Sequence, residues 1–68
     1  MLKNIEAERA RAALTKEAVS KELGISSKTY LHYIREERPI PSDTLLKMSS
    51  LFGCSVEYLL GVNNGGKE

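Results

Sequence analysis

The sequence has little cysteine and histidine, no tryptophan and no long hydrophobic run: one cysteine and one histidine occur among 68 residues. A single cysteine excludes a disulfide within the chain, and with one histidine it excludes any recognisable zinc site. No apolar stretch approaches the roughly 18 residues that a membrane helix needs, and no signal-peptide core lies near the N-terminus. We therefore expect a small, soluble, intracellular domain without a metal.

An excess of one charge is also lacking. Ten Lys and Arg stand against nine Asp and Glu, and the hydrophobic fraction of 41% is ordinary for a globular domain. The first 38 residues carry eight basic and six acidic side chains, and the remaining 30 carry two and three. Any surface that binds nucleic acid should therefore be a local patch rather than a basic field.

The chain is too short for a roomy catalytic pocket. It should form a single domain, and a domain of this size buries only about 60% of the surface of its unfolded chain. No nucleophile beside a general base and no pair of catalytic carboxylates is visible in the sequence. We predict a binding protein rather than an enzyme, with no cofactor and no small-molecule substrate.

Apolar residues recur at helical spacing, without the alternation that is typical of strands. We predict an all-α fold, a compact bundle of five helices at about residues 4–13, 16–23, 27–35, 43–52 and 56–60. Side chains that can cap a helix N-terminus are expected to start four of them: Thr15, Ser26, Ser42 and Ser55. Glycines are expected to end three: Gly24, Gly53 and Gly61.

The first and last segments of the chain give two further expectations. In the first helix, Ile5, Ala12 and Ala13 should face inward. The six residues from Asn63 to Glu68 contain no apolar side chain and include two consecutive glycines. We predict a domain over residues 1–61 and a flexible C-terminal tail over residues 62–68.

The most informative stretch is residues 16–35. Its two short predicted helices are separated only by Gly24, Ile25 and Ser26, so they must cross steeply, as in a helix-turn-helix. Gly24 supplies the positive φ of the turn, and the small Ser20 lies where the two helices approach closely. The apolar positions of such a unit are filled by Val19, Leu23, Ile25, Tyr30 and Tyr33. We interpret the two tyrosines as core residues rather than as platforms for stacking bases.

The outward side of the helix at 27–35 then carries Ser27, Lys28, Leu31 and His32, with Arg35 at its end. Short hydroxyl donors, a lysine and a histidine one turn later could contact base edges in a major groove. On an isolated helix, Lys28 and His32 would be ordinary solvated residues. Lys16 begins the preceding helix, where backbone N–H groups attract anions such as phosphate.

Five segments in this order resemble the XRE-like family of Cro- and repressor-type helix-turn-helix proteins. They are Leu14–Glu17, Leu23–Ser26, Arg38–Pro41, Leu45–Met48 and Phe52–Gly61. The resemblance covers residues 2–61 and implies a lambda-repressor-like domain, with residues 27–35 as the recognition helix. It implies base contacts from Ser27, Lys28, Thr29 and His32. We expect DNA backbone contacts from Thr15, Lys16, Ser26, Arg35 and Arg38.

Departures from the family pattern affect both the scaffold and the expected interface. Ile34 stands where the family often has an acidic residue that pairs with an arginine at the position of Arg9, so Arg9 needs another partner or points to solvent. Ser20 replaces the usual alanine. Glu36 replaces a common glycine, and with Glu37 it should weaken DNA binding or be aimed away from the DNA.

The last predicted helix carries more apolar residues than one face can bury. We therefore predict a homodimer through Val56, Tyr58 and Leu59, with two recognition helices about 34 Å apart on a near-palindromic site. Cys54 should be a packing residue rather than a reactive thiol.

These features favour sequence-specific binding of double-stranded DNA by a small transcriptional regulator. Repression by occupying a promoter in the bacterial cytoplasm is the simplest mechanism. The alternative is a protein-interaction module of the same fold, an antitoxin-like or anti-repressor partner. Leu31 on the outward side, the two carboxylates at 36–37 and the low net charge favour that alternative.

Overall fold

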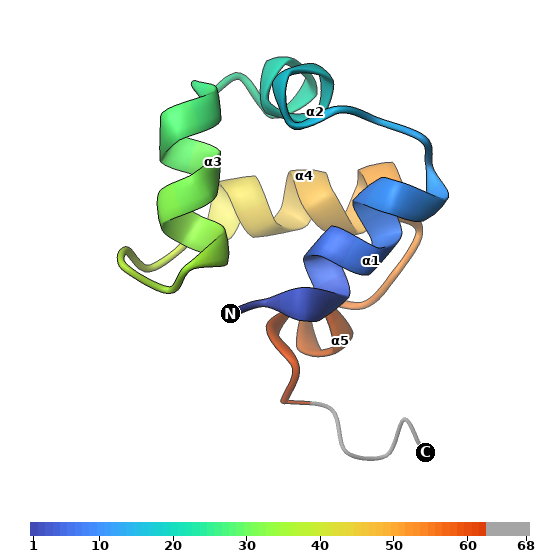
Figure 1. The fold of residues 1–68 in the computed structure, drawn as a ribbon. Coiled ribbons are helices and arrows are strands. Elements are labelled where there is room, and N and C mark those ends of the chain that lie inside the picture. Colours follow the sequence, from blue (N-terminus) through green and yellow to red (C-terminus); the bar gives the residue numbers. More distant parts are fainter. Residues whose placement is uncertain (63–68) are drawn as a thin grey trace.

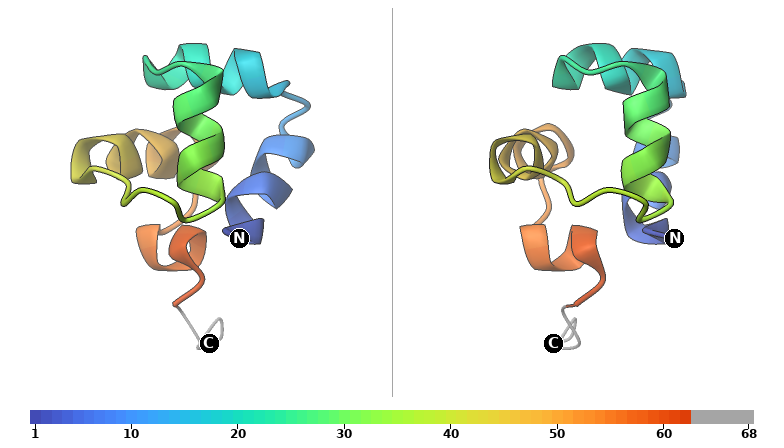
Figure 2. Two further views of the ribbon diagram at one scale, coloured as in Figure 1. Left: turned by 60° about the vertical axis from the view of Figure 1, so that its left-hand side comes forward. Right: turned by 90° about the vertical axis from the view of Figure 1, so that its left-hand side faces the viewer.

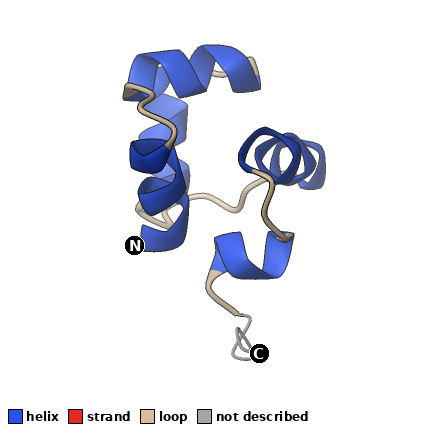
Figure 3. Ribbon diagram, turned by 90° about the vertical axis from the view of Figure 1, so that its right-hand side faces the viewer, coloured by secondary structure: helices blue, strands red, loops and turns tan. Residues whose placement is uncertain are grey.

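A computed structural model describes residues 1–62 as five helices joined by short connections (Figure 1). The helices are α1 (Lys3–Arg11), α2 (Lys16–Leu23), α3 (Ser27–Ile34), α4 (Ser42–Phe52) and α5 (Val56–Leu60). The part of the chain that is described contains no strand, as the colouring of Figure 3 shows. The predicted all-α class and the number of helices are confirmed for these residues. The predicted flexible tail, apart from Val62, lies outside them.

Three helices start at a side-chain cap, as predicted. The side-chain oxygens of Thr15, Ser26 and Ser55 each accept the backbone N–H three residues on, at 3.0 to 3.1 Å. The predicted cap at Ser42 is wrong, because Ser42 is itself the first residue of α4 and Pro41 stands before it without a side-chain cap. The fixed backbone of Pro41 leads into the helix, and its carbonyl accepts the N–H of Leu45.

Five residues in the left-handed region follow or end the helices. Gly24, Gly53 and Gly61 have φ between 66° and 75°, as their predicted role requires. Ala13 (φ 59°) and Glu36 (φ 63°) take the same conformation after α1 and α3. Because α1 ends at Arg11, Ala12 and Ala13 are exposed, and the expectation that they face inward is wrong.

The core lies where α1, α2, α3, α4 and α5 converge. Its fully or almost fully buried apolar residues are Ile5, Val19, Leu23, Tyr30, Ile34, Met48 and Leu59. The tyrosine rings of positions 30 and 33 are both buried, which confirms their interpretation as core residues. No helix of residues 1–62 is both long and apolar enough to cross a membrane.

The arrangement leaves one side of α3 uncovered. α2 lies across one end of α3 at a steep angle, α1 lies behind it, and α4 lies to one side of it (Figures 1 and 2). In the two views of Figure 2, taken from the α3 side of the molecule, no other helix passes in front of α3. The fold therefore presents the helix that was predicted to recognise DNA along its outer side.

Candidate nucleic-acid interface

The turn between α2 and α3 is built from backbone hydrogen bonds around one glycine. The N–H of Gly24 donates to the carbonyl of Lys21 at 3.1 Å, and the N–H of Ile25 donates to that of Ser20 at 3.0 Å. Together with the positive φ of Gly24, these bonds turn the chain steeply within three residues. Ile25 then packs against the core and fixes the turn to the body of the domain.

Close approach of α2 to the rest of the fold is possible because Ser20 is small. Its side chain is almost fully buried, and its hydroxyl donates to the carbonyl of Lys16 at 2.6 Å. The hydroxyl is therefore satisfied within its own helix, and no partner from α3 is needed. Among residues 1–62 no buried side-chain nitrogen or oxygen lacks a hydrogen-bond partner, so serine in place of the family's usual alanine leaves none unpaired.

The starts of α2 and α3 carry six of the residues that were predicted to contact DNA: Thr15, Lys16, Ser26, Ser27, Lys28 and Thr29. Thr15 and Lys16 are exposed at the start of α2. At the start of α3, the Ser26 hydroxyl donates to the Thr29 side-chain oxygen at 3.0 Å while accepting the N–H of Thr29. The Ser26 hydroxyl proton thus points to Thr29, and the Thr29 hydroxyl still has a proton to donate.

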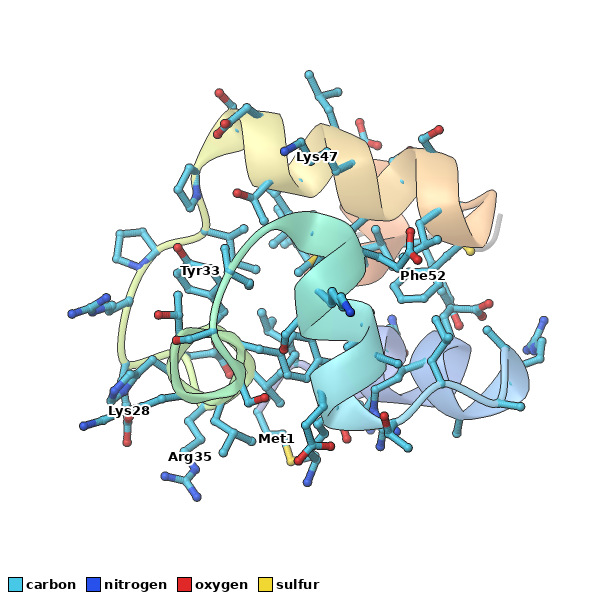
Figure 4. All side chains as sticks on the ribbon, turned by 90° about the horizontal axis from the view of Figure 1, so that it is seen from above. Met1, Lys28, Tyr33, Arg35, Lys47 and Phe52 are labelled. Carbon is cyan, nitrogen blue, oxygen red and sulfur yellow. The ribbon has the colours of Figure 1, made fainter. Side chains whose placement is uncertain are left out.

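Two positive side chains extend from α3 into solvent. Lys28 and Arg35 reach away from the body of the domain at one edge of Figure 4. Ser27, Leu31 and His32 lie half-buried on the same helix. The structure thus brings the predicted base-contacting residues onto one short helix. Arg38 is exposed in the loop that follows.

The two carboxylates that follow α3, those of Glu36 and Glu37, both have a partner in the structure. Oε2 of Glu36 lies 2.6 Å from the amino group of Met1. Oε1 of Glu37 lies 2.7 Å from Nδ1 of His32. Neither contact was predicted from the sequence. Glu37 lies five residues beyond His32, outside the spacing at which helix neighbours meet, so only the turn after α3 brings them together.

A second unpredicted group joins α1 to α3. Arg9 donates from Nε and Nη2 to the carboxylate of Glu6 at 3.2 and 2.9 Å, and from Nη1 to the carbonyl of Leu14 at 2.6 Å. The Tyr30 hydroxyl donates to the same carboxylate. The hydrogen bond from Arg9 lowers the pKa of Glu6, and burial raises the pKa of Tyr30. Arg9 therefore has a partner within its own helix, at the i, i+3 spacing that the sequence contained.

The end of the domain that was predicted to dimerise is only partly exposed. Leu59 is fully buried within one chain, so a partner chain cannot contact its side chain, and this assignment is corrected. Val56 and Tyr58 are half-buried, and the Tyr58 hydroxyl donates to Glu8 at 3.2 Å. Sequence reasoning missed Val62, which is 62% exposed. Val62 borders a groove of about 480 Å³ with Leu2, Ile40 and Leu60.

Two other features bear on chemistry. Burial raises the pKa of the Cys54 thiol, and Glu8 raises it further, which disfavours the reactive thiolate. This agrees with a packing role for Cys54, which lies against the core. Within residues 1–62 no three metal-ligating side chains gather in one place.

Comparisons with known proteins agree with this geometry. Residues 5–59 match a protein family described as helix-turn-helix. The chain is 33% identical over 66 residues to the HTH-type transcriptional regulator ImmR of Bacillus subtilis (strain 168). The aligned region is 97% of this chain and 52% of that relative, so the chain spans about half the length of the relative it matches. No solved structure matches the chain.

Proposed function

Because the chain belongs to the XRE-like helix-turn-helix family, we propose that it binds double-stranded DNA sequence-specifically and regulates transcription. The observation that carries the proposal is the uncovered outer side of α3, which presents Lys28 next to the short polar side chains of its first turn. An α-helix fits the major groove, where each base pair has a distinct pattern of donors and acceptors. The relative's description as a transcriptional regulator supports the same conclusion.

In the proposed complex, α3 lies in the major groove. Ser27, Lys28, Thr29 and His32 contact base edges. Contacts to phosphates come from the start of α2, the cap of α3 and the segment after it, namely from Thr15, Lys16, Ser26, Arg35 and Arg38. The backbone N–H groups at the start of α2 add to the attraction for a phosphate beside Lys16. The protein acts by occupying a promoter, without catalysis, in the cytoplasm where its operator lies.

A homodimer on a near-palindromic operator is part of this proposal. Val56 and Tyr58 remain the proposed contacts, and the exposed Val62 and its groove extend the apolar surface at the same end of the domain. Two copies would place their α3 helices about 34 Å apart, one turn of DNA.

Selection of bound duplexes from a random library, read by sequencing, tests the proposal directly. We expect an enriched near-palindrome, and binding that falls by about 0.9 log unit per phosphate contact for each log unit of salt. The double variant Lys16→Ala, Lys28→Ala should lose binding. If the folded protein enriches no duplex, the DNA-binding proposal is wrong, and a protein partner that contacts Leu31 becomes the hypothesis to test.

A further inference from the structure

His32 and Glu37 are joined by two hydrogen bonds, one of the backbone and one of the side chains. The N–H of Glu37 donates to the carbonyl of His32 at 2.9 Å, and the N–H of Glu36 donates to that of Tyr33 at 3.0 Å. This pair of bonds, with Glu36 at φ 63°, folds the chain back over the last turn of α3. The turn carries the Glu37 carboxylate to His32, where Oε1 lies 2.7 Å from Nδ1. The position of Glu37 is therefore set by the backbone.

The carboxylate determines which ring nitrogen of His32 carries the proton. An ionised carboxylate only accepts hydrogen bonds, so Nδ1 must donate its N–H to Glu37. In the neutral ring, a proton on Nδ1 leaves Nε2 with a lone pair and without a proton. Nε2 is then a hydrogen-bond acceptor. The side chain of His32 remains 31% exposed, so the ring is accessible from solvent.

His32 also lies on the face of α3 that is proposed to contact bases. It follows Lys28 by four residues, and residues four apart lie on the same face of a helix. The Lys28 ammonium can only donate, so it suits the acceptor atoms O6 and N7 of guanine. An Nε2 that accepts hydrogen bonds suits a hydrogen-bond donor on a base edge instead.

We propose that Glu37 fixes His32 as a hydrogen-bond acceptor, so that His32 selects an exocyclic amine, N6 of adenine or N4 of cytosine, in the major groove. Glu37 is the positioning residue, and His32 is the specificity-determining one. This inference rests on the proposed function, because it names the base chemistry read by one residue of that interface. It also gives Glu37 a purpose at a position where a lone carboxylate would repel the DNA.

The first experiment needs no DNA. The chain contains one histidine, so the ¹⁵N chemical shifts of its ring report the tautomer without ambiguity. We expect the neutral ring to carry its proton on Nδ1 in the folded protein, and to be a mixture of tautomers in Glu37→Gln, because an amide can both donate and accept. A ring that is protonated on Nε2 in the wild-type protein would overturn the proposal.

The second experiment locates and alters the base that His32 reads. Duplexes are selected with the wild-type protein and with His32→Ala. The comparison identifies the operator position at which the variant no longer prefers one base. Duplexes are then synthesised that lack the exocyclic amine at that position, or that carry a 7-deazapurine in place of the purine N7. Removing the amine should weaken wild-type binding by at least about five-fold, and binding of His32→Ala by less than about two-fold. Loss caused by the 7-deazapurine instead would show a donating His32 and would overturn the proposal.

Glu36→Gln is the matched control for Glu37→Gln, since it removes the same charge from the adjacent residue, whose partner is Met1. Both variants should bind DNA somewhat more tightly, because each removes a negative charge. Only Glu37→Gln should lose the dependence on the exocyclic amine. If neither the wild-type protein nor the variants enrich any duplex, both this inference and the proposed function are wrong. Enrichment without dependence on the amine overturns this inference alone.

Discussion

The phenol of Tyr30 donates a hydrogen bond of 2.6 Å to Oε2 of Glu6, which joins α3 to α1 across 24 residues of sequence. Arg9 holds the same carboxylate from within α1 and also donates to the carbonyl of Leu14, in the connection to α2. The Glu6–Arg9 pair thus ties both α3 and the connection before α2 to the first helix. Glu6 is the partner of Arg9 here, whereas the family often has that acidic partner at the position of Ile34, which this chain buries in the core.

Removing the Tyr30 hydroxyl should destabilise the domain. Hydrogen bonds to charged groups contribute about 1.5–3 kcal/mol, so we expect Tyr30→Phe to lower the free energy of unfolding by about 1–3 kcal/mol. The ring and its packing are retained. Urea unfolding followed by circular dichroism measures the change. Tyr33→Phe is the control, because the Tyr33 ring is also buried while its hydroxyl is not part of this network. Equal losses in both variants would contradict the role assigned to Glu6.

The same network should make stability depend on acid pH. The hydrogen bond from Arg9 lowers the pKa of Glu6 below its ordinary value. A carboxylate with a lowered folded-state pKa stabilises the fold above its unfolded-state pKa, and this contribution is lost as the pH falls through the folded-state value. In Glu6→Gln, the free energy of unfolding should therefore fall less between neutral and acid pH than it does in the wild-type protein. The exposed Glu22→Gln on α2 is the comparison, and an identical pH profile for the two variants would refute the expectation.

Glycine at position 36 should stabilise the domain. A left-handed conformation costs a residue other than glycine roughly 1–2 kcal/mol, and the extra freedom of unfolded glycine offsets about 0.5–1 kcal/mol of that gain. We expect Glu36→Gly to raise the free energy of unfolding by about 0.5–1 kcal/mol, as measured by urea unfolding. Glu36→Ala loses the same exposed ion pair with Met1 but keeps the unfavourable φ, so it should bring no gain. Ala13→Gly tests the same physics at a site without a carboxylate.

Lys28 should contribute to recognition of the operator, whereas another exposed lysine should not. We expect Lys28→Ala to weaken binding to the selected site by about 1–3 kcal/mol and to weaken non-specific binding less. Lys47→Ala is the control, since Lys47 is exposed on α4 and not on α3 (Figure 4). Fluorescence anisotropy with labelled duplexes measures both. Equal weakening of Lys28→Ala on all sequences would mean that this lysine only binds phosphate.

Two apolar residues near the C-terminal end of the described chain should behave differently. Leu59 is fully buried, so Leu59→Ala should cost about 2–5 kcal/mol of unfolding free energy in the monomer. Val62 is exposed, so Val62→Ser should leave monomer stability nearly unchanged and weaken the proposed dimer. Sedimentation over a range of concentrations measures the association. A wild-type protein that remains a 7.6 kDa species at micromolar concentration would contradict the proposed homodimer.

Local features were predictable because their causes lie within a few residues. The caps at Thr15, Ser26 and Ser55 and the left-handed glycines at 24, 53 and 61 satisfy backbone groups of adjacent turns. The inward positions of Val19, Leu23, Tyr30 and Tyr33 follow from helical periodicity. The errors also have local explanations. At Ser42 a proline took the cap position, and α1 ended at Arg11, so that Ala12 and Ala13 never reached the core.

The amino-acid sequence by itself determined the five helices, the steep turn between α2 and α3, and which residues occupy the outer side of α3. Only the tertiary structure decided that Glu6 is shared by Arg9 and Tyr30, that Leu59 is inside rather than at a surface, and that Glu37 reaches His32. The physical reason is that helix starts, ends and faces depend on neighbouring hydrogen bonds and periodicity. Contacts between helices depend on how the helices pack, and the Glu37 contact depends on a turn in which a glutamate adopts the conformation that favours glycine.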